Sequence, residues 1–156
     1  QSRQGMGTTL TSALLGDEEL TLAHVGDSRA YRLRDGELTR LTTDHSLVGE
    51  LLRRREISPD AAREHPQRHV LTRAVGVRAQ VEPDLAELSP DANDVFVLCS
   101  DGLTGHVRDE EIAKAVCGGV DPQEAIDALI RLANSRGGDD NITVVVVRCE
   151  KSADSE

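Results

Sequence analysis

The sequence predicts an α+β fold, in which antiparallel sheets pack under helices, because strand signals and helix signals occupy different parts of the chain. Short apolar runs separated by turn residues dominate the beginning, and two segments with helix-start signals lie near the end. The early connections are too short for a parallel crossover, so the strands they join should pair antiparallel. A chain of 156 residues can bury one ordinary core, which favours a single domain.

The first zone, which extends to about Leu41, is predicted to form consecutive β-hairpins. Its turn signals are Gly16-Asp17, Gly26-Asp27-Ser28 and Asp35-Gly36, and Asp-Gly is a strong signal for a short hairpin. The strands expected between these turns are Thr8 to Leu15, Leu20 to Val25, Ala30 to Leu33 and Leu38 to Leu41.

The middle zone, about residues 44–76, is polar and basic and has weak helical periodicity. Leu47, Val48, Leu51 and Leu52 recur at helical spacing. Ser58-Pro59 favours the start of a second, short helix, and His65-Pro66 should end it. These features are typical of a flap that lies on a scaffold.

The last zone combines strands and helices. Asp94 to Ser100 is a β-rich run, and helices should start at Asp109 and at Asp121-Pro122. Gly137-Gly138 should end the second helix. The β-branched run from Ile142 to Val147 predicts a strand that is buried on both faces.

Composition argues against several classes of partner. The chain has a net charge of -10 and only two aromatic residues, Tyr31 and Phe96, so it lacks both the basic surface and the stacking platforms of nucleic-acid binders. No apolar run approaches the roughly 20 residues of a membrane helix. The three cysteines never form C-x-x-C, which favours buried thiols in a reducing compartment. The start at Gln1 to Gln4 resembles a cut end.

Three aspartates in turns are the candidate metal ligands. Asp27 lies between two predicted strands, Asp101 follows the end of a buried strand, and Asp140 precedes the start of another. If the last two strands pair antiparallel, Asp101 and Asp140 meet at one sheet edge, where a hard Mg²⁺ or Mn²⁺ would offset their repulsion. Each motif taken alone is more often ordinary turn chemistry, and the five histidines and Arg53 to Arg55 are read as surface or structural.

The order of the motifs resembles that of the bacterial PP2C (PPM) metal-dependent serine/threonine protein phosphatases. The resemblance covers about Gly5 to Arg148. The motifs that carry it are Met6-Gly7-Thr8-Thr9, Ala23 to Tyr31, Thr43-Asp44-His45-Ser46, His65-Pro66, Leu71 to Gly76, Leu98 to Thr104 and Gly137 to Val144.

The resemblance implies a β-sandwich of two antiparallel sheets flanked by helix pairs, with Mn²⁺ or Mg²⁺ ions at one edge. Two ions would activate a water that hydrolyses phosphoserine or phosphothreonine. Asp101 and Asp140 match the family's ligands to the core metal pair, and Asp27 matches the acid that holds a third metal together with Asp101. The implied organisation is a partial phosphatase domain over residues 1–148, with a flap at about 44–76, and a polar tail over 149–156.

One departure from the family pattern concerns its opening segment. The chain contains neither the Arg-x-x-Asn-Glu-Asp run nor the Asp-Gly-x-Gly-Gly turn, so we expect the N-terminal strands and the metal-bridging Asp to be missing and this chain to be poorly active. The expected partners are phosphorylated proteins, opposite a serine/threonine kinase, in the cytoplasm. A non-catalytic module that binds a phosphoprotein or regulates a partner stays open as the alternative, as does a phosphatase of the branch that regulates sigma-factor antagonists.

Overall fold

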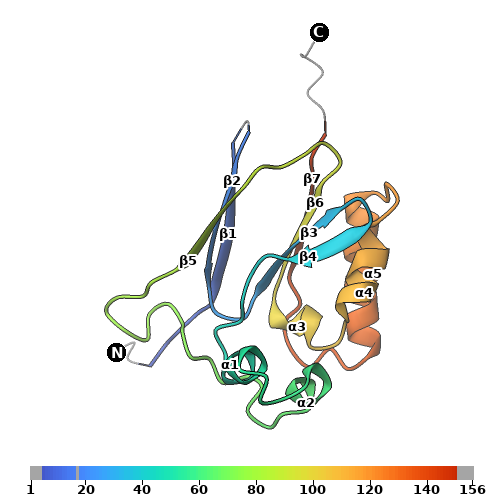
Figure 1. The fold of residues 1–156 in the computed structure, drawn as a ribbon. Helices are drawn as coiled ribbons and strands as arrows, with labels where there is room; N and C mark the ends of the chain where they lie inside the picture. Colours follow the sequence, from blue (N-terminus) through green and yellow to red (C-terminus); the bar gives the residue numbers. More distant parts are fainter. Residues whose placement is uncertain (1–4, 17, 151–156) are drawn as a thin grey trace. The chain divides into compact units, whose positions relative to one another are not determined.

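The computed structural model describes residues 5–16 and 18–150, which divide into two compact units. The first unit is formed by Gln1–Ser28 and Thr42–Leu88, and the second by Arg29–Leu41 and Ser89–Glu156 (Figure 1). The interpretation of Gln1 to Gln4, of Asp17 in the first turn and of most of the polar tail falls outside the described residues.

The first unit contains a three-stranded antiparallel sheet with the order β1-β2-β5. Strand β1 (Leu10–Leu15) pairs with β2 (Leu20–Val25), as the apolar runs predict. Strand β5 (Asp84–Leu88) pairs with the other side of β2, from Leu20↔Leu88 to His24↔Asp84. Strand β5 has no signal in the sequence, because this short strand has no β-branched residue and contains two acids, which are depleted in strands.

Two short helices complete the first unit, both where the sequence predicts them. Helix α1 (Leu47–Arg53) is capped by Ser46, whose side chain accepts a hydrogen bond from Gly49 N. Helix α2 (Pro59–Arg63) is capped in the same way by Ser58 and has Pro59 in its first turn. The segment closes at its base, because Leu47 N donates to Val70 O at 2.8 Å and Thr72 N donates to His45 O at 2.8 Å.

The second unit contains a four-stranded antiparallel sheet with the order β4-β3-β6-β7. Strands β3 (Arg29–Arg34) and β4 (Glu37–Arg40) form the hairpin that Asp35-Gly36 predicts. Both turn residues have positive φ, 51° and 82°, as a type I′ turn requires. Strand β6 (Val95–Cys99) lies between β3 and β7 (Val144–Arg148), and both of its pairings are antiparallel.

Helices pack on this sheet and form the core of the second unit (Figure 1). A short helix, α3 (Asp101–Thr104), follows β6 directly, and α4 (Asp109–Val116) and α5 (Pro122–Ser135) come next. Asp121 caps α5 by accepting hydrogen bonds from Gln123 N and Glu124 N. The buried core joins strand and helix side chains: Tyr31, Leu33, Val95, Val97, Cys99, Leu103, Val107, Ile112, Val116, Ala125, Leu129 and Ala133.

The α+β class and the two antiparallel sheets are confirmed, and two details of the prediction are wrong. Strands β2 and β3 do not form a hairpin, because they belong to different sheets, so Gly26-Asp27-Ser28 is a crossing between sheets. Strand β7 is not buried on both faces. It is an end strand of its sheet in the described part of the chain, and Val145 and Val147 are 47% and 36% exposed.

Candidate metal centre

The end of β6 lies beside the start of β7, as the sequence predicts for Asp101 and Asp140. The last pair of the two strands is Cys99↔Val144. Beyond this pair, Ser100 N donates to Thr143 O at 3.0 Å, and Thr143 N donates to Ser100 Oγ at 3.0 Å. Asp101 is the next residue and begins α3, so it lies in a helix and not in the turn that the sequence suggests.

Gly102 brings the backbone around the two acids into direct contact. A Cβ atom on Gly102 would lie 2.4 Å from Asn141 O and 3.5 Å from Asp140 C. Ser100 Oγ also donates to Asn141 O, at 3.0 Å. Only glycine therefore fits between the start of α3 and the loop that carries Asp140, and Asp101 and Asp140 belong to touching backbone segments.

The loop before β7 presents Asp140 at the surface. Two glycines with positive φ, Gly137 at 135° and Gly138 at 60°, turn the chain after α5. Asp140 Oδ1 accepts a hydrogen bond from Asn141 N at 2.7 Å, which bends the backbone around this carboxylate. His106 Nε2 lies 3.7 Å from Asp139 Oδ2 and ties the loop to the segment after α3.

Asp27 belongs to the first unit, in the turn that follows β2. Gly26 has φ 115°, and a Cβ atom there would lie 2.4 Å from Thr9 Cγ2, so the turn requires glycine. The hydroxyls of Thr9 and Ser28 lie 2.9 Å apart and join the turn to the residue that precedes β1.

His45 is the residue at this turn that the sequence analysis missed. The sequence predicts a surface or structural histidine here, yet His45 is 4% exposed and bonds to both backbone groups of Gly26. Gly26 N donates to His45 Nδ1 at 3.1 Å, and His45 N donates to Gly26 O at 2.7 Å. One feature of the sequence could have indicated that His45 is buried. His45 precedes Ser46, which caps a helix with a buried face.

Asp84 and Arg73 extend this arrangement. His45 Nε2 lies 3.0 Å from Asp84 Oδ2, and Arg73 Nη1 donates to Asp84 Oδ1 at 2.5 Å. Partial burial of the Asp84 carboxylate raises its pKa. The hydrogen bonds from Arg73 and His45 lower the pKa, and the net result is a pKa below the usual value. Asp84 therefore faces His45 as a carboxylate at neutral pH.

The chemistry of the donor set fits a hard divalent cation, since Asp27, Asp101 and Asp140 all offer carboxylate oxygens. Among residues 5–16 and 18–150, no group of three or more His, Cys, Asp or Glu side chains is arranged as a metal site. Asp101 and Asp140 are the pair that one unit brings together, and Asp27 is held by the other unit.

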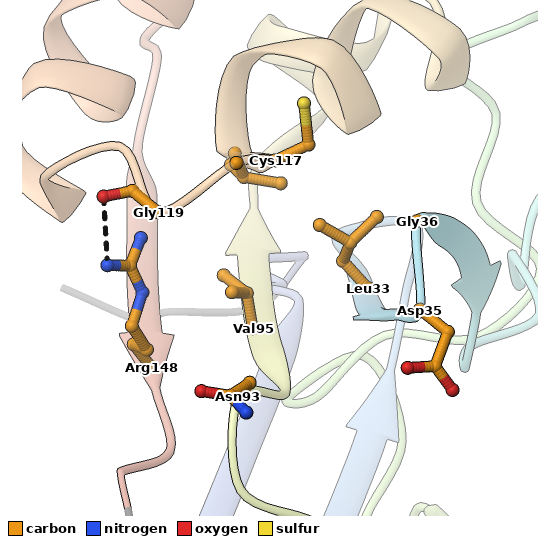
Figure 2. A pocket seen from close by; sticks show the side chains of 10 residues that line it. Leu33, Asp35, Gly36, Asn93, Val95, Cys117, Gly119 and Arg148 are labelled. Atoms are coloured by element: carbon orange, nitrogen blue, oxygen red, sulfur yellow. Dashed lines mark hydrogen bonds between the residues drawn. The ribbon is translucent and has the colours of Figure 1, made fainter.

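A pocket of about 340 Å³ lies elsewhere in the second unit and is lined by Leu33, Cys117 and Arg148, among others (Figure 2). The pair Val95↔Arg148 places this pocket at the end of the β6–β7 ladder that is remote from Asp101. Figure 2 shows the Arg148 guanidinium directed at Gly119, whose carbonyl oxygen accepts its hydrogen bond at 3.2 Å. This pocket is therefore not part of the candidate metal centre, which consists of Asp27, Asp101 and Asp140.

The fold and the acidic strand ends define a class of protein, namely α+β domains with aspartates at the ends of strands in antiparallel sheets. The family model described as protein phosphatase 2C matches residues 1–142. The chain belongs to this family. It is 46% identical over 143 residues to the serine/threonine phosphatase stp of Listeria welshimeri, a match that covers 92% of this chain and 57% of the relative.

Solved structures agree with this assignment. The serine/threonine phosphatase PstP/Ppp of Mycobacterium tuberculosis is 45% identical, with a TM-score of 0.89 over 95% of this chain and 62% of that one. The catalytic domain of PstP in complex with 2 manganese ions is 42% identical, with a TM-score of 0.85 over 95% of this chain and 61% of that one. The chain thus spans about three-fifths of the length of these relatives.

No helix in the described part of the chain is long and apolar enough to cross a lipid bilayer.

Proposed function

We propose that this protein is a metal-dependent protein serine/threonine phosphatase, which hydrolyses phosphoserine and phosphothreonine in phosphoproteins. The observation that carries the proposal is the contact between the backbone at Gly102 and Asn141, which gathers Asp101 and Asp140 at one end of the β6–β7 ladder. The family assignment and the manganese-bound relative support the reaction and the metal.

In this proposal Asp101 and Asp140 hold the core metal ions, and Asp27 is a ligand of a third ion. When bound, Mn²⁺ or Mg²⁺ ions supply an activated water and offset charge on the phosphoryl oxygens. The chain's own contribution is to hold the carboxylates in place. The ladder fixes the backbone before Asp101 and after Asp140, and the glycine turn fixes Asp27.

The proposed domain includes residues 1–148, with residues 44–76 as a flap. The closed base of this segment, where Leu47 bonds to Val70 and Thr72 bonds to His45, supports a flap that is anchored at both ends. The proposed partners are phosphorylated proteins, opposite a serine/threonine kinase, in the cytoplasm. The tail, residues 149–156, has no role in the proposal.

The 156 residues contain no Arg-x-x-Asn-Glu-Asp run and no Asp-Gly-x-Gly-Gly turn. In the family pattern these motifs supply the metal-bridging Asp and the arginine that holds phosphate. We therefore expect this chain to bind Mn²⁺ but to hydrolyse phosphopeptides only slowly.

The test combines Mn²⁺ binding with turnover of a phosphothreonine peptide by the 156-residue chain. Free Mn²⁺ is measured by electron paramagnetic resonance in wild type, Asp101→Asn and Asp140→Asn, with the surface change Asp60→Asn as the matched control. We expect both site variants to bind Mn²⁺ at least about tenfold more weakly than wild type, and the control to match wild type. Equal binding in all four chains would contradict the metal centre.

A second candidate is a non-catalytic module that binds a phosphoprotein or regulates a partner. The same experiment separates the two candidates. Slow but Mn²⁺-dependent release of phosphate that is lost in Asp101→Asn supports the enzyme. Phosphopeptide binding without any release of phosphate supports the module.

A further inference from the structure

We propose that His45 is a positioning residue, which fixes the Gly26–Asp27 turn through one specific tautomer of its imidazole ring. The hydrogen bond from Gly26 N to His45 Nδ1 is 3.1 Å long and buried. A backbone N–H is always a donor, so Nδ1 must be the acceptor and cannot carry a proton. The neutral ring then has its proton on Nε2.

Asp84 selects the same tautomer from the other side of the ring. Its Oδ2 lies 3.0 Å from His45 Nε2, and a carboxylate can only accept a hydrogen bond. Arg73 holds Asp84 through Oδ1 at 2.5 Å and also donates to Glu82 O at 3.1 Å. Since β5 is paired with β2, this carboxylate is part of the same sheet as the strand that leads into the turn.

The turn is therefore held at Gly26 from several directions. The Nδ1 atom of His45 accepts a hydrogen bond from Gly26 N, and the backbone N–H of His45 donates to Gly26 O. The Thr9 side chain fills the space that a Cβ atom on Gly26 would need. With both peptide groups of Gly26 fixed, the start of Asp27 is fixed as well. The consequence for metal binding rests on the proposed role of Asp27, whereas the consequence for the turn does not.

Two substitutions of His45 test the contacts of the two ring nitrogens one at a time. In His45→Asn the side-chain oxygen can replace Nδ1 as acceptor for Gly26 N, and the contact with Asp84 is lost. In His45→Gln the longer amide can reach Asp84, and the acceptor beside Gly26 is lost. His69→Gln, at an exposed histidine of the same unit, is the matched control.

The decisive measurement is nuclear magnetic resonance of the ¹⁵N-labelled, metal-free chain. We expect a scalar coupling across the hydrogen bond between Gly26 N and His45 Nδ1, and ring ¹⁵N shifts of the Nε2–H tautomer. The Gly26 amide should exchange with solvent about tenfold faster in His45→Gln, while His45→Asn and His69→Gln stay close to wild type. Absence of the coupling, or an Nδ1–H ring, overturns the proposal even if a variant fails to fold.

Added Mn²⁺ separates this inference from the proposed function. Broadening of the Asp27 and Ser28 amides in wild type supports the metal role of Asp27, and we expect His45→Gln to need about 10- to 100-fold more Mn²⁺ for the same effect. If wild type shows no broadening there, the metal role of Asp27 is wrong, and the metal-free measurement still decides the role of His45. Equal Mn²⁺ dependence in wild type and His45→Gln would remove His45 from metal binding.

Discussion

His24 is a buried histidine whose two ring nitrogens are both engaged. Thr11 Oγ1 lies 2.9 Å from Nδ1 and Thr43 O lies 3.1 Å from Nε2, and the residue is 2% exposed. Burial, together with the His45 ring at a centroid distance of 4.8 Å, lowers the pKa of His24 below its usual value. As the pH falls, His24 is therefore protonated at a higher pH in the unfolded chain than in the folded chain.

This difference predicts an acid-dependent loss of stability near neutral pH. Because the unfolded state binds more protons, the free energy of unfolding should fall as the pH decreases through the unfolded pKa of about 6.5. His24→Gln can still donate to Thr43 O but cannot titrate, so its stability should change less over the same range. Urea unfolding between about pH 7.5 and about pH 5.5 measures the difference. A slope as steep in His24→Gln as in His69→Gln would contradict this assignment.

Asp94 is a buried carboxylate that depends on one arginine. It is 1% exposed, and Arg34 binds it with two parallel hydrogen bonds, Nε to Oδ1 at 2.7 Å and Nη2 to Oδ2 at 2.6 Å. The hydrogen bonds from Arg34 outweigh burial and lower the pKa of Asp94. Removing the arginine would leave an ionised side chain buried beside the start of β6.

Arg34→Met is therefore expected to lower the free energy of unfolding clearly more than a surface change does, because the buried Asp94 carboxylate loses its charged partner. Arg53→Met, at an exposed position at the end of α1, should change the free energy of unfolding by less than about 0.5 kcal/mol. Chemical denaturation of both variants at neutral pH tests this. Similar losses in the two variants would show that the pair with Asp94 contributes little.

At the scale of the elements, Gly102 joins α3 to the loop before β7. Gly102→Ala would place a methyl group 2.4 Å from Asn141 O, so the loop that carries Asp140 must move. We expect a loss of stability of about 1–3 kcal/mol, and weaker Mn²⁺ binding than in wild type. Gly16→Ala is the control, because its nearest atom is an ordinary 3.5 Å away. Mn²⁺ titration of the two variants checks the prediction. Unchanged Mn²⁺ binding in Gly102→Ala would show that the contact between Gly102 and Asn141 does not affect the metal centre.

Elements with strong local signals could be predicted from the sequence. Asp35-Gly36 formed its hairpin, and Ser58-Pro59 and Asp121-Pro122 started their helices, because turn and capping chemistry is local. The strand β5 could not be predicted, since its stability comes from pairing with β2 and not from its own residues. The exposure of β7 depends equally on where its strand lies in the sheet.

The candidate site shows the same division. The order of the chain suggested that Asp101 and Asp140 meet, and the antiparallel ladder between β6 and β7 confirmed the pairing behind that suggestion. The roles of these residues as metal ligands stay a prediction. The contact between His45 and Asp84 joins positions 39 residues apart, and no local pattern indicates it.

At the scale of the whole molecule, both sheets end in strands that present apolar side chains. Strand β7 carries Val145, 47% exposed, and β1 carries Leu14, 74% exposed. Each is an end strand of its sheet within the described residues, so its outer backbone groups are available for pairing. The run in β7, Val144–Arg148, is β-branched and contains no proline, a composition that is prone to association.

We therefore expect the 156-residue chain to self-associate in a concentration-dependent way. Val145→Lys places a charge in the middle of β7 and should shift the chain toward the monomer. Val77→Lys adds the same charge at a 60% exposed position outside the strands and should leave association unchanged. Sedimentation velocity distinguishes the three proteins. A wild-type chain that stays monomeric over the tested concentrations would contradict this expectation.

The two units are interleaved along the chain, and this affects the order in which they can fold. The β3–β4 hairpin is made early, yet its sheet is completed only by β6 and β7, more than fifty residues later. In the same way, the sheet of the first unit is completed only when β5 pairs with β2. Such distant pairings slow folding. During synthesis on a ribosome, neither sheet can be completed until its last strand has emerged, so the early strands remain open to non-native pairing and to chaperones until then.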